Sequence, residues 1–472
     1  MSSRPGLSKR PSSSGKDVSP PPSKRRQQST TTNKAVANFF TPVSKKEPEK
    51  MVWRVVKDSL LVGRFGTAAA QSATKRRRIA AFDFDSTLIT SASGRTFSRD
   101  ASDWKWWDSS VPGRLKELHN DGFLIAIISN QGGISLKPDP KTVKSDQKRL
   151  ADFKTKVTAV LTQLDLPISI YAATSRDQYR KPRTGMWQEL LEDYDVEHAD
   201  AVDLENSVFV GDAGGREAVV AGSAAKDHSC SDRDFAANVG IPFHTPEEYF
   251  RHEEPRSFVR AFEPTAYMEE RAEQPKSAIF TKPATPEIVL FCGCPGAGKS
   301  SFYWKHLQPF GYARVNQDTL KTPSARVVRL PNTLSNTLRQ REKCVKAATA
   351  FLQEGTSAVI DNTNADPDTR AVWITLAQKL NVPIRCVLFT APPKLCEHND
   401  AFRALNIGPE SNRESRTILP HIAFSGFASR YREPKSAEGF ADIITADFEV
   451  RVIRTPTTDE WTCKRIIWVS GT

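Results

Sequence analysis

The sequence has no long apolar run and few cysteines, and both deficits narrow the class of protein. No window of its 472 residues reaches the roughly 18 consecutive apolar residues that a membrane-spanning helix needs. The N-terminal stretch MSSRPGLSKRPSSSG lacks the apolar centre of a secretory signal peptide. The seven cysteines are scattered and odd in number, unlike a disulfide framework. We therefore expect a protein without membrane spans that works in a reducing intracellular compartment.

Acidic residues are scarce at the N-terminus, where most of the net charge lies. Residues 1–50 hold 11 Lys and Arg against 3 Asp and Glu, so they carry +8 of the chain's net charge of +12. The rest of the chain carries only +4, and this charge alone is no argument for nucleic-acid binding. Residues 1–50 are rich in Ser and Pro and poor in apolar residues, which predicts a disordered basic tail.

Two basic runs near this end of the chain are typical of nuclear-import signals. They are PPPSKRR at residues 20–26 and KRRR at residues 75–78. A solvated charge cluster is the alternative for both, and the second run directly precedes an apolar strand, which weakens the import interpretation there. We predict a nuclear protein on the first run.

A short apolar motif, NKAVANFF at residues 33–40, interrupts the polar tail. On a helical turn Val36, Phe39 and Phe40 would form one apolar knob, because residues three and four apart share a helix face. The motif resembles a degenerate form of the one that docks onto the sliding clamp of replication, with Asn33 where glutamine is usual. Docking onto a clamp and folding back onto the body of the protein both stay open.

Two carboxylates follow an apolar run in RIAAFDFDSTL at residues 78–88. The run predicts a buried strand that ends before Asp83 and Asp85. Further strands at 123–128, 168–173 and 207–210, with a helix at about 144–164, predict a parallel sheet whose site lies at its carboxyl edge. A carboxylate there can attack phosphorus and form an aspartyl-phosphate while its neighbour handles protons. Crowded acids at a phosphoryl site need a divalent cation, and oxygen ligands favour Mg²⁺.

These residues resemble the haloacid dehalogenase phosphatases. The resemblance implies Asp83 as the nucleophile and Asp85 as the general acid, and later as the base that activates water. It implies that Ser129 holds a phosphate oxygen and that Lys181, in YRKPR, neutralises charge developing on the phosphoryl group. Mg²⁺ would be bound by Asp83, by the backbone carbonyl of Asp85 and by Asp212.

The cation site departs from that family pattern in one respect. No second acid closely follows Asp212 in GDAGGR at residues 211–216. The segment KDHSCSD at residues 226–232 offers Asp227 and Asp232, and the sequence does not decide between them.

A second apolar run, predicted as a strand at residues 287–292, ends in a glycine-rich loop. The loop, GCPGAGKS at residues 293–300, matches the GxxxxGK[ST] pattern in full. Its glycines let backbone N–H groups turn toward phosphate oxygens, while Lys299 would reach the β- and γ-phosphates of ATP and Ser300 would ligate Mg²⁺. The predicted nucleotide-binding residues are Gly293, Gly296, Ala297, Gly298, Lys299, Ser300, Ser301 and Arg403.

Three further residues favour a kinase over other P-loop proteins. Asp318, in NQDTL, ends an apolar stretch and would accept the proton of the attacking hydroxyl. Asp361 ends another predicted strand and suits Mg²⁺ or its waters. Arg403 is a candidate lid arginine over the transferred phosphate, or else the partner in a surface salt bridge.

A phosphatase and a kinase in one chain would cycle a single substrate futilely unless they act on different positions. Nucleic-acid breaks offer such positions, because a 3′-phosphate blocks extension and a missing 5′-phosphate blocks ligation. Most of residues 51–472 closely resembles the bifunctional polynucleotide kinase 3′-phosphatases of eukaryotic DNA repair. That resemblance implies hydrolysis of 3′-phosphates and ATP-dependent phosphorylation of 5′-OH ends in DNA. The motifs that carry it are FDFDSTL, SNQGG, RKP, VGDAGGR, DHSCSD, TPEEYF, PGAGKS, QDTL and DNTN.

The predicted fold class is α/β, with two parallel-sheet α/β sandwiches, haloacid dehalogenase-like and then P-loop kinase-like. The expected divisions are a tail at 1–50, a phosphatase domain at 51–251, a linker at 252–284 and a kinase domain at 285–472. The tail replaces the phosphopeptide-binding domain of animal relatives, and residues 321–341 look like an insertion after Asp318. We expect a monomer.

Three questions stay open at this point. The same two activities acting on RNA ends are one alternative, and only substrate preference separates that function from DNA repair. A catalytically dead scaffold is the other alternative, although the intact Asp83, Asp85, Lys181, Lys299, Ser300 and Asp318 argue against it. The aromatic run WKWW at residues 104–107 suits base stacking, core packing or a lid over the phosphatase cleft.

Overall fold

The structure, a computed structural model, describes most of the chain between residues 50 and 446. The described ranges are 50–66, 76–96, 98–137, 140–198, 200–219, 225–260, 262–263, 266–269, 280–318, 333–405 and 414–446. The motif around Val36, Phe39 and Phe40, the basic run at 20–26, Lys75 and residues 321–332 of the expected insertion lie outside these ranges. Across the described ranges, none of the helices has the length and apolar character needed to span a membrane.

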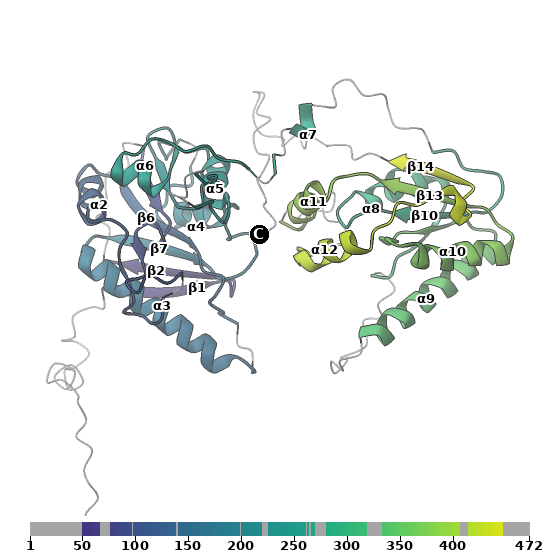
Figure 1. Cartoon of the computed structure of the whole chain (residues 1–472), viewed down its shortest axis with the longest axis horizontal. Helices are drawn as coiled ribbons and strands as arrows, with labels where there is room; N and C mark the ends of the chain where they lie inside the picture. The colour runs from purple at the N-terminus through teal and green to yellow at the C-terminus, as the bar shows by residue number, and fades with distance from the viewer. Residues whose placement is uncertain are drawn as a thin grey trace, which may run out of the picture. The chain divides into compact units, whose positions relative to one another are not determined.

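The first sheet has seven strands in the order β1-β2-β7-β6-β3-β8-β9. Figure 1 labels the first four of them, β1, β2, β7 and β6. Its five strands from β7 to β9 are parallel, as predicted, whereas β1 and β2 form an antiparallel hairpin on the edge next to β7, which was not predicted. The strands are β1 (Met51–Val56), β2 (Leu60–Phe65), β3 (Ile79–Phe82), β6 (Leu124–Asn130), β7 (Ile168–Ala173), β8 (Val208–Val210) and β9 (Phe243–His244).

Helices cover both faces of this sheet, and strand β3 shows why its sequence is apolar throughout. Side chains alternate between the two faces of a strand. Ala80 and Phe82 join the core beneath α2 (Val111–Asn120), α3 (Val143–Leu164) and α6 (Pro246–Arg251). Ile79 and Ala81 join the core beneath α4 (Gly185–Asp193) and α5 (Ser231–Val239). A strand buried on both faces cannot carry polar residues until it ends, and Asp83 is the first.

The second sheet has five strands, all parallel as predicted, in the order β11-β12-β10-β13-β14. Its first strand in the chain is therefore central. The strands are β10 (Ile288–Cys292), β11 (Ala313–Val315), β12 (Ala358–Ile360), β13 (Ile384–Phe389) and β14 (Asp442–Ala446). Apolar cores lie on both of its faces, so each sheet is the centre of a three-layer α/β sandwich.

The helices of the second sandwich include one irregular element directly after the glycine-rich loop. There α8 (Lys299–Phe302) runs into the π-helical turn η2 (Tyr303–Leu307) and the 3₁₀ turn η3 (Gln308–Phe310). The other elements are α9 (Thr333–Gln353), α10 (Pro367–Leu380), α11 (Pro393–Leu405), α12 (His421–Arg430) and η4 (Ser436–Glu438). Residues 333–341 of the expected insertion belong to α9.

Two sequence features outside the sheets now have a structural description. A small hairpin of β4 (Ile89–Thr90) and β5 (Lys105–Trp106) carries the WKWW run, whose three tryptophans are partly buried against the core of the first sandwich. Core packing therefore accounts for them.

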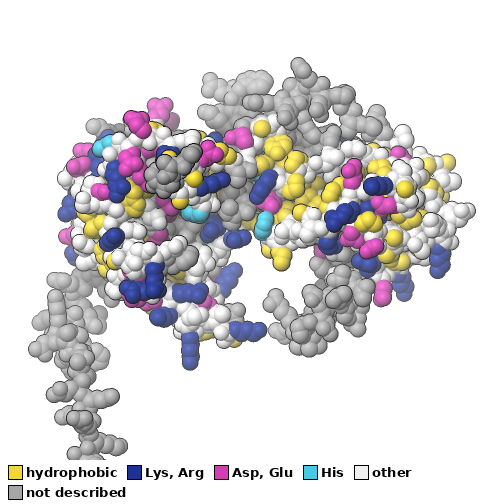
Figure 2. Space-filling view, viewed as in Figure 1, with side chains coloured by type: hydrophobic (Ala, Val, Ile, Leu, Met, Phe, Trp, Pro, Cys, Tyr) yellow, Lys and Arg dark blue, Asp and Glu magenta, His cyan; other side chains and the backbone are white. Residues whose placement is uncertain are grey.

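The connector between the sandwiches contains the short helix α7 (Ala266–Glu269). Figure 2 shows basic and acidic side chains interspersed over the visible surface, as expected for a body of low net charge.

Candidate active sites

Strand ends at the carboxyl edge of the first sheet bring three carboxylates together. Asp83 follows β3, Asp212 lies two residues after β8, and Asp232 is in the first turn of α5. One oxygen from each of the three lies within 4.8 Å of the others. Carboxyl ends of parallel strands meet at one edge of a sheet, so residues far apart in sequence converge there.

Lys181 provides the positive charge in this cluster. Its Nζ lies 2.6 Å from Asp83 Oδ1 and 2.9 Å from Asp232 Oδ1, and the residue is 2% exposed. Burial alone would lower the pKa of Lys181, but Asp232 and Asp83 raise it above its ordinary value, so the amine stays charged. Asn130 fixes the backbone of Lys181: its Oδ1 accepts the Lys181 N–H at 2.9 Å and its Nδ2 donates to the Lys181 carbonyl at 3.2 Å.

The three acids outnumber the single cation, and this imbalance fits a metal site. Burial, together with Asp232 and Asp83, raises the pKa of Asp212 to about 8. Carboxylates crowded in this way repel one another until a cation neutralises them. The donors are all oxygens, which is the ligand type that Mg²⁺ prefers. Asp83, Asp212 and Asp232 are therefore the residues suited to hold a divalent cation.

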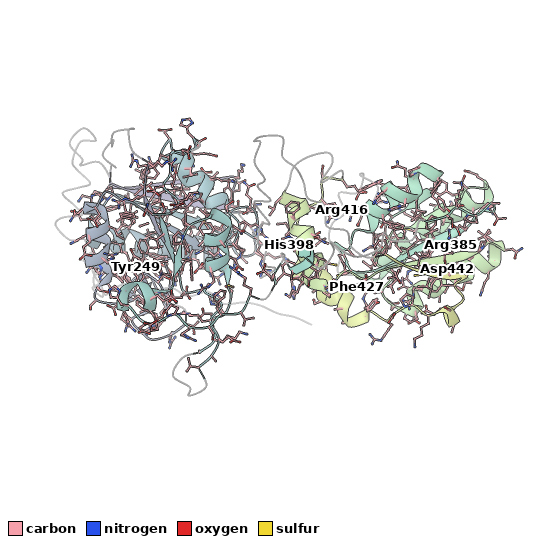
Figure 3. The ribbon with its side chains drawn as sticks, turned by 90° about the horizontal axis from the view of Figure 1, so that it is seen from above. Tyr249, Arg385, His398, Arg416, Phe427 and Asp442 are labelled. Atoms are coloured by element: carbon pink, nitrogen blue, oxygen red, sulfur yellow. The ribbon has the colours of Figure 1, made fainter. Side chains whose placement is uncertain are left out.

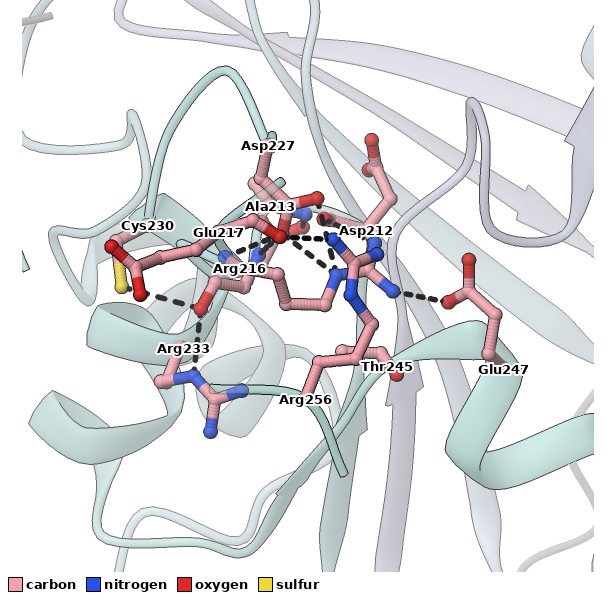
Figure 4. A network of polar contacts seen from close by, with 12 residues as sticks. Asp212, Ala213, Arg216, Glu217, Asp227, Cys230, Arg233, Thr245, Glu247 and Arg256 are labelled. Carbon is pink, nitrogen blue, oxygen red and sulfur yellow. Dashed lines mark hydrogen bonds and ion pairs between the residues drawn. The ribbon is translucent and has the colours of Figure 1, made fainter. Parts of the chain in front are cut away.

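Of the two candidates for the additional acid, the structure brings only Asp232 to the cluster. Asp227 accepts hydrogen bonds from Arg216 Nε at 2.9 Å and from the backbone N–H groups of Gly214 and Arg216 at 3.1 and 3.0 Å (Figure 4). These hydrogen bonds hold the backbone of the loop that follows β8. Gly211 explains how Asp232 comes so close, because a Cβ at Gly211 would lie 2.3 Å from Asp232 Oδ2.

Gln131 links the predicted proton donor to the predicted phosphate ligand. Its Nε2 donates to Asp85 Oδ2 at 2.7 Å and to Ser129 Oγ at 3.0 Å. Solvent reaches Asp85, but the protein atoms packed around it and the charge on Asp83 raise its pKa, although the Gln131 hydrogen bond lowers it. A raised pKa brings a carboxyl group closer to the range that suits a general acid. The motif SNQ contained this residue, but nothing in the sequence indicated its contact with Asp85.

The glycine-rich loop borders a cleft of about 570 Å³ in the second sandwich. Gly296 and Gly298 have φ values of 81° and 91°, which side chains other than glycine's rarely allow. Lys299 is 9% exposed, and its Nζ donates to the carbonyls of Gly293 and Cys294 at 2.9 and 2.6 Å. Burial lowers the pKa of Lys299 below its ordinary value.

The predicted magnesium ligands of the cleft contact each other. Ser300 Oγ donates to Asp361 Oδ2 at 2.9 Å. Arg314, in β11, joins both: its Nη2 donates to Ser300 Oγ at 3.0 Å and its Nε to Asp361 Oδ2 at 2.7 Å. A hydroxyl and a carboxylate at the end of a phosphate-binding loop suit Mg²⁺. Sequence reasoning missed Arg314, because only the pairing of β11 with β12 brings it to Asp361.

Asp318 and Arg403 line the same cleft. Asp318 is exposed, its N–H donates to Asn316 Oδ1 at 2.8 Å, and its carboxylate lies 3.8 Å from Arg416 Nη1. Arg403 is partly exposed and forms an ion pair with Asp400, which is 1% exposed, so it lines the cleft and also takes part in a salt bridge. Ala297 and Ser301 belong to the loop and the first turn of α8 as predicted, and Ser301 lines the cleft.

The two folds and their sites define a class: a haloacid dehalogenase-type phosphatase fused to a P-loop kinase. Residues 78–250 match the family model described as polynucleotide kinase 3 phosphatase, and residues 288–424 match an AAA domain. The chain is 37% identical over 401 residues to the bifunctional polynucleotide phosphatase/kinase of Schizosaccharomyces pombe, covering 84% of this chain and 85% of that protein. It belongs to the bifunctional polynucleotide phosphatase/kinase family, as the motifs predicted.

Two further relatives are similar to part of the chain. The polynucleotide 3′-phosphatase of Saccharomyces cerevisiae is 29% identical over 214 residues, covering 36% of this chain and 86% of that protein. The polynucleotide 3′-phosphatase ZDP of Arabidopsis thaliana is 33% identical over 185 residues, covering 37% of this chain and 24% of that protein.

Proposed function

We propose that this protein heals broken DNA ends, removing 3′-phosphates at the Asp83 site and phosphorylating 5′-hydroxyls with ATP at the Lys299 site. The phosphatase domain would comprise residues 51–251 and the kinase domain residues 285–472, joined by a linker at 252–284. One observation carries the proposal. A buried Lys181 among three carboxylates occurs in the same chain as a complete phosphate-binding loop beside Asp318.

At the phosphatase site, Asp83 attacks phosphorus and forms an aspartyl-phosphate. Lys181 holds Oδ1 of Asp83, which leaves the other oxygen for the attack. Asp85 donates its proton to the departing 3′-oxygen and then takes a proton from the water that hydrolyses the intermediate. Ser129 holds a phosphoryl oxygen, and Lys181 balances the charge that builds up on the phosphoryl group. Mg²⁺ bound by Asp83, Asp212 and Asp232 would add positive charge next to the phosphoryl oxygens.

At the kinase site, the loop around Gly296 and Lys299 holds the phosphates of ATP. The oxygen of the 5′-hydroxyl attacks the γ-phosphorus while Asp318 takes the hydroxyl proton, and ADP leaves. Asn316 fixes the backbone of Asp318 by accepting its N–H. Ser300 and Asp361 would hold Mg²⁺ or its waters, and Arg403 lines the cleft where it can stabilise the transferred charge.

The tail carries two further parts of the proposal. The basic run at 20–26 would direct the protein, acting as a monomer, to the nucleus, and Val36, Phe39 and Phe40 would dock onto a sliding clamp. Capture of the clamp by the intact protein, with loss of capture on joint Phe39→Ala and Phe40→Ala substitution, is the expected result. Equal capture by both proteins would show that the motif does not dock.

The test of the two activities uses one duplex whose nick carries a 3′-phosphate and a 5′-OH, with Mg²⁺ and labelled ATP. Wild type, Asp83→Ala and Lys299→Ala are compared on this DNA and on its RNA counterpart. We expect Asp83→Ala to lose only dephosphorylation and Lys299→Ala to lose only phosphorylation. A wild type that heals neither end would overturn the proposal, and a strong preference for the RNA duplex would assign the activities to RNA ends.

A further inference from the structure

The kinase cleft contains an aromatic side chain that the catalytic steps do not use. Trp304 lines the cleft together with Ser300 and Asp318, and it is partly buried. It lies four residues after Ser300, so the two side chains share one face of the helical segment. The segment widens into the π-helical turn η2 at Tyr303, and such turns are frequent at functional sites.

The contacts of Trp304 place it on the side of the cleft that holds Asp318. The guanidinium carbon of Arg314 lies 5.2 Å from the centroid of the Trp304 ring. Arg314 belongs to β11, the strand that leads to Asp318, and β11 is the edge strand on one side of β10. Arg403 follows β13, which lies on the opposite side of β10. Trp304 is therefore connected to the acceptor side of the sheet.

The lining of the cleft also includes apolar and basic side chains. Leu419, Ala423 and Phe427 line the same cleft. Phe427 belongs to a buried apolar core, and Leu419, Ala423 and Trp304 all pack against that core. Arg416 and Arg430 also line the cleft, and Figure 3 shows Arg416 and Phe427 in this part of the protein. A cleft lined by an aromatic ring, apolar side chains and cations suits a nucleobase attached to a phosphodiester backbone.

We propose that Trp304 stacks on the 5′-terminal nucleobase of the acceptor strand and so presents its 5′-hydroxyl to Asp318. This inference rests on the proposed kinase function and adds a subsite to it. Because stacking needs only a π face, the site accepts any base but discriminates against an end without one.

The test measures 5′-phosphorylation of single-stranded oligonucleotides whose 5′-terminal nucleotide carries a base or is abasic, in the full-length protein. Trp304→Leu keeps an apolar side chain but removes the π face, and Trp304→Phe keeps a smaller aromatic ring. We expect Trp304→Leu to raise KM for the normal strand about tenfold, while kcat and the KM for ATP stay within twofold. Trp304→Phe should stay within about threefold of wild type.

The abasic strand distinguishes stacking from a structural role. For wild type, we expect its KM to be about tenfold higher than that of the normal strand, and Trp304→Leu should raise it no further. Phe310→Ala, which removes an exposed aromatic ring of η3 outside the cleft, should change none of these values.

Three results would overturn the proposal. An equal loss on both strands in Trp304→Leu would make Trp304 a structural residue. A rise in the KM for ATP alone would assign it to the donor base. Wild-type KM values that are the same for both strands would mean that no base is bound. Each presupposes that wild type phosphorylates the normal strand, so a failure of the proposed function itself would be seen separately.

Discussion

Each of the two domains buries a cation, and the surroundings of these cations differ in charge balance. In the second domain the side chain of Arg370 is 0% exposed. Its Nε and Nη2 donate to the Glu438 carboxylate at 2.7 Å each. Its Nη1 donates to three backbone carbonyls at 2.9–3.2 Å. In the first domain Lys181 contacts two of three clustered acids. Arg370 is neutralised by one carboxylate, whereas the Lys181 cluster keeps an excess of negative charge.

That difference separates a structural cation, Arg370, from Lys181, the cation that we propose takes part in catalysis. A buried ion pair whose hydrogen bonds are all satisfied fixes the chain and attracts no further ion. A buried cluster with unbalanced charge is costly until a cation enters, and such clusters are characteristic of active sites. Breaking the Arg370–Glu438 pair should therefore lower the stability of the fold. Altering the acids around Lys181 should lower the phosphatase rate.

The largest effect is expected from Asp232→Asn. This change removes one acid of the cation site and one of the two partners of Lys181, so the phosphatase kcat should fall by about 10²–10³-fold. The matched control is Asp227→Asn, which weakens the contacts of Asp227 with Arg216 and Gly214 outside the carboxylate cluster. Phosphatase rates at increasing Mg²⁺ concentration measure both, and similar losses in the two variants would contradict the assignment of Asp232.

Glu438→Gln should destabilise the kinase domain by about 3 kcal/mol, because it leaves the buried charge of Arg370 without its acid. The measurement is heat inactivation of the kinase activity in the full-length protein, with the phosphatase activity as a reference. Glu433→Gln, a change at a nearby exposed acid, is the control. Unchanged stability in Glu438→Gln would show that the carbonyls suffice for Arg370.

The same pair predicts a pH dependence. Burial alone would raise the pKa of Glu438, but the hydrogen bonds from Arg370 lower it below its ordinary value. A carboxylate with a depressed folded-state pKa stabilises the fold above the unfolded pKa of about 4.3 and loses this contribution as the pH falls through the folded pKa. The stability difference between wild type and Glu438→Gln should thus be full at pH 7 and shrink below about pH 4.

Arg314→Gln tests whether Arg314 supports the kinase reaction by orienting Ser300 and Asp361, without itself contacting the substrate. Ser300 and Asp361 lose a shared hydrogen-bond donor, so the kinase kcat/KM should fall about 10–100-fold, as for other residues that orient metal ligands. Arg385→Gln removes the ion pair of Arg385 with the buried Glu287 and lies outside the cleft, so it should leave kinase kcat within about twofold. Equal losses in both would show a general loss of packing.

The smallest effect is expected from Gln131→Ala. Loss of one hydrogen bond to Asp85 and one to Ser129 should slow the phosphatase about fivefold, equivalent to roughly 1 kcal/mol. The exposed Gln188 of α4 provides the control Gln188→Ala. Initial rates on a 3′-phosphorylated oligonucleotide suffice, and an unchanged rate would mean that Asp85 needs no orientation.

The sequence predicted those parts of the fold and sites that lie on single continuous segments. Strand β3 and the loop at 293–300 could be read directly, because a strand buried on both faces is apolar until its functional residues begin. The β1–β2 hairpin was not predicted, because β1 buries little of its surface and its sequence shows no clear alternation of apolar and polar residues. The choice of Asp232 over Asp227 depended on the close approach of α5 to Gly211, and the role of Arg314 on the pairing of β11 with β12. Such contacts arise only after folding.

The packing of Gly296 has a mechanical consequence for the kinase cleft. A Cβ at Gly296 would lie 2.2 Å from the carbonyl oxygen of Cys396 in α11, and Asn399 Nδ2 donates to the Gly296 carbonyl at 3.3 Å. The backbone of the loop therefore packs directly against α11. Because α11 also carries Arg403, a tilt of this helix would displace the phosphate-binding loop and Arg403 together.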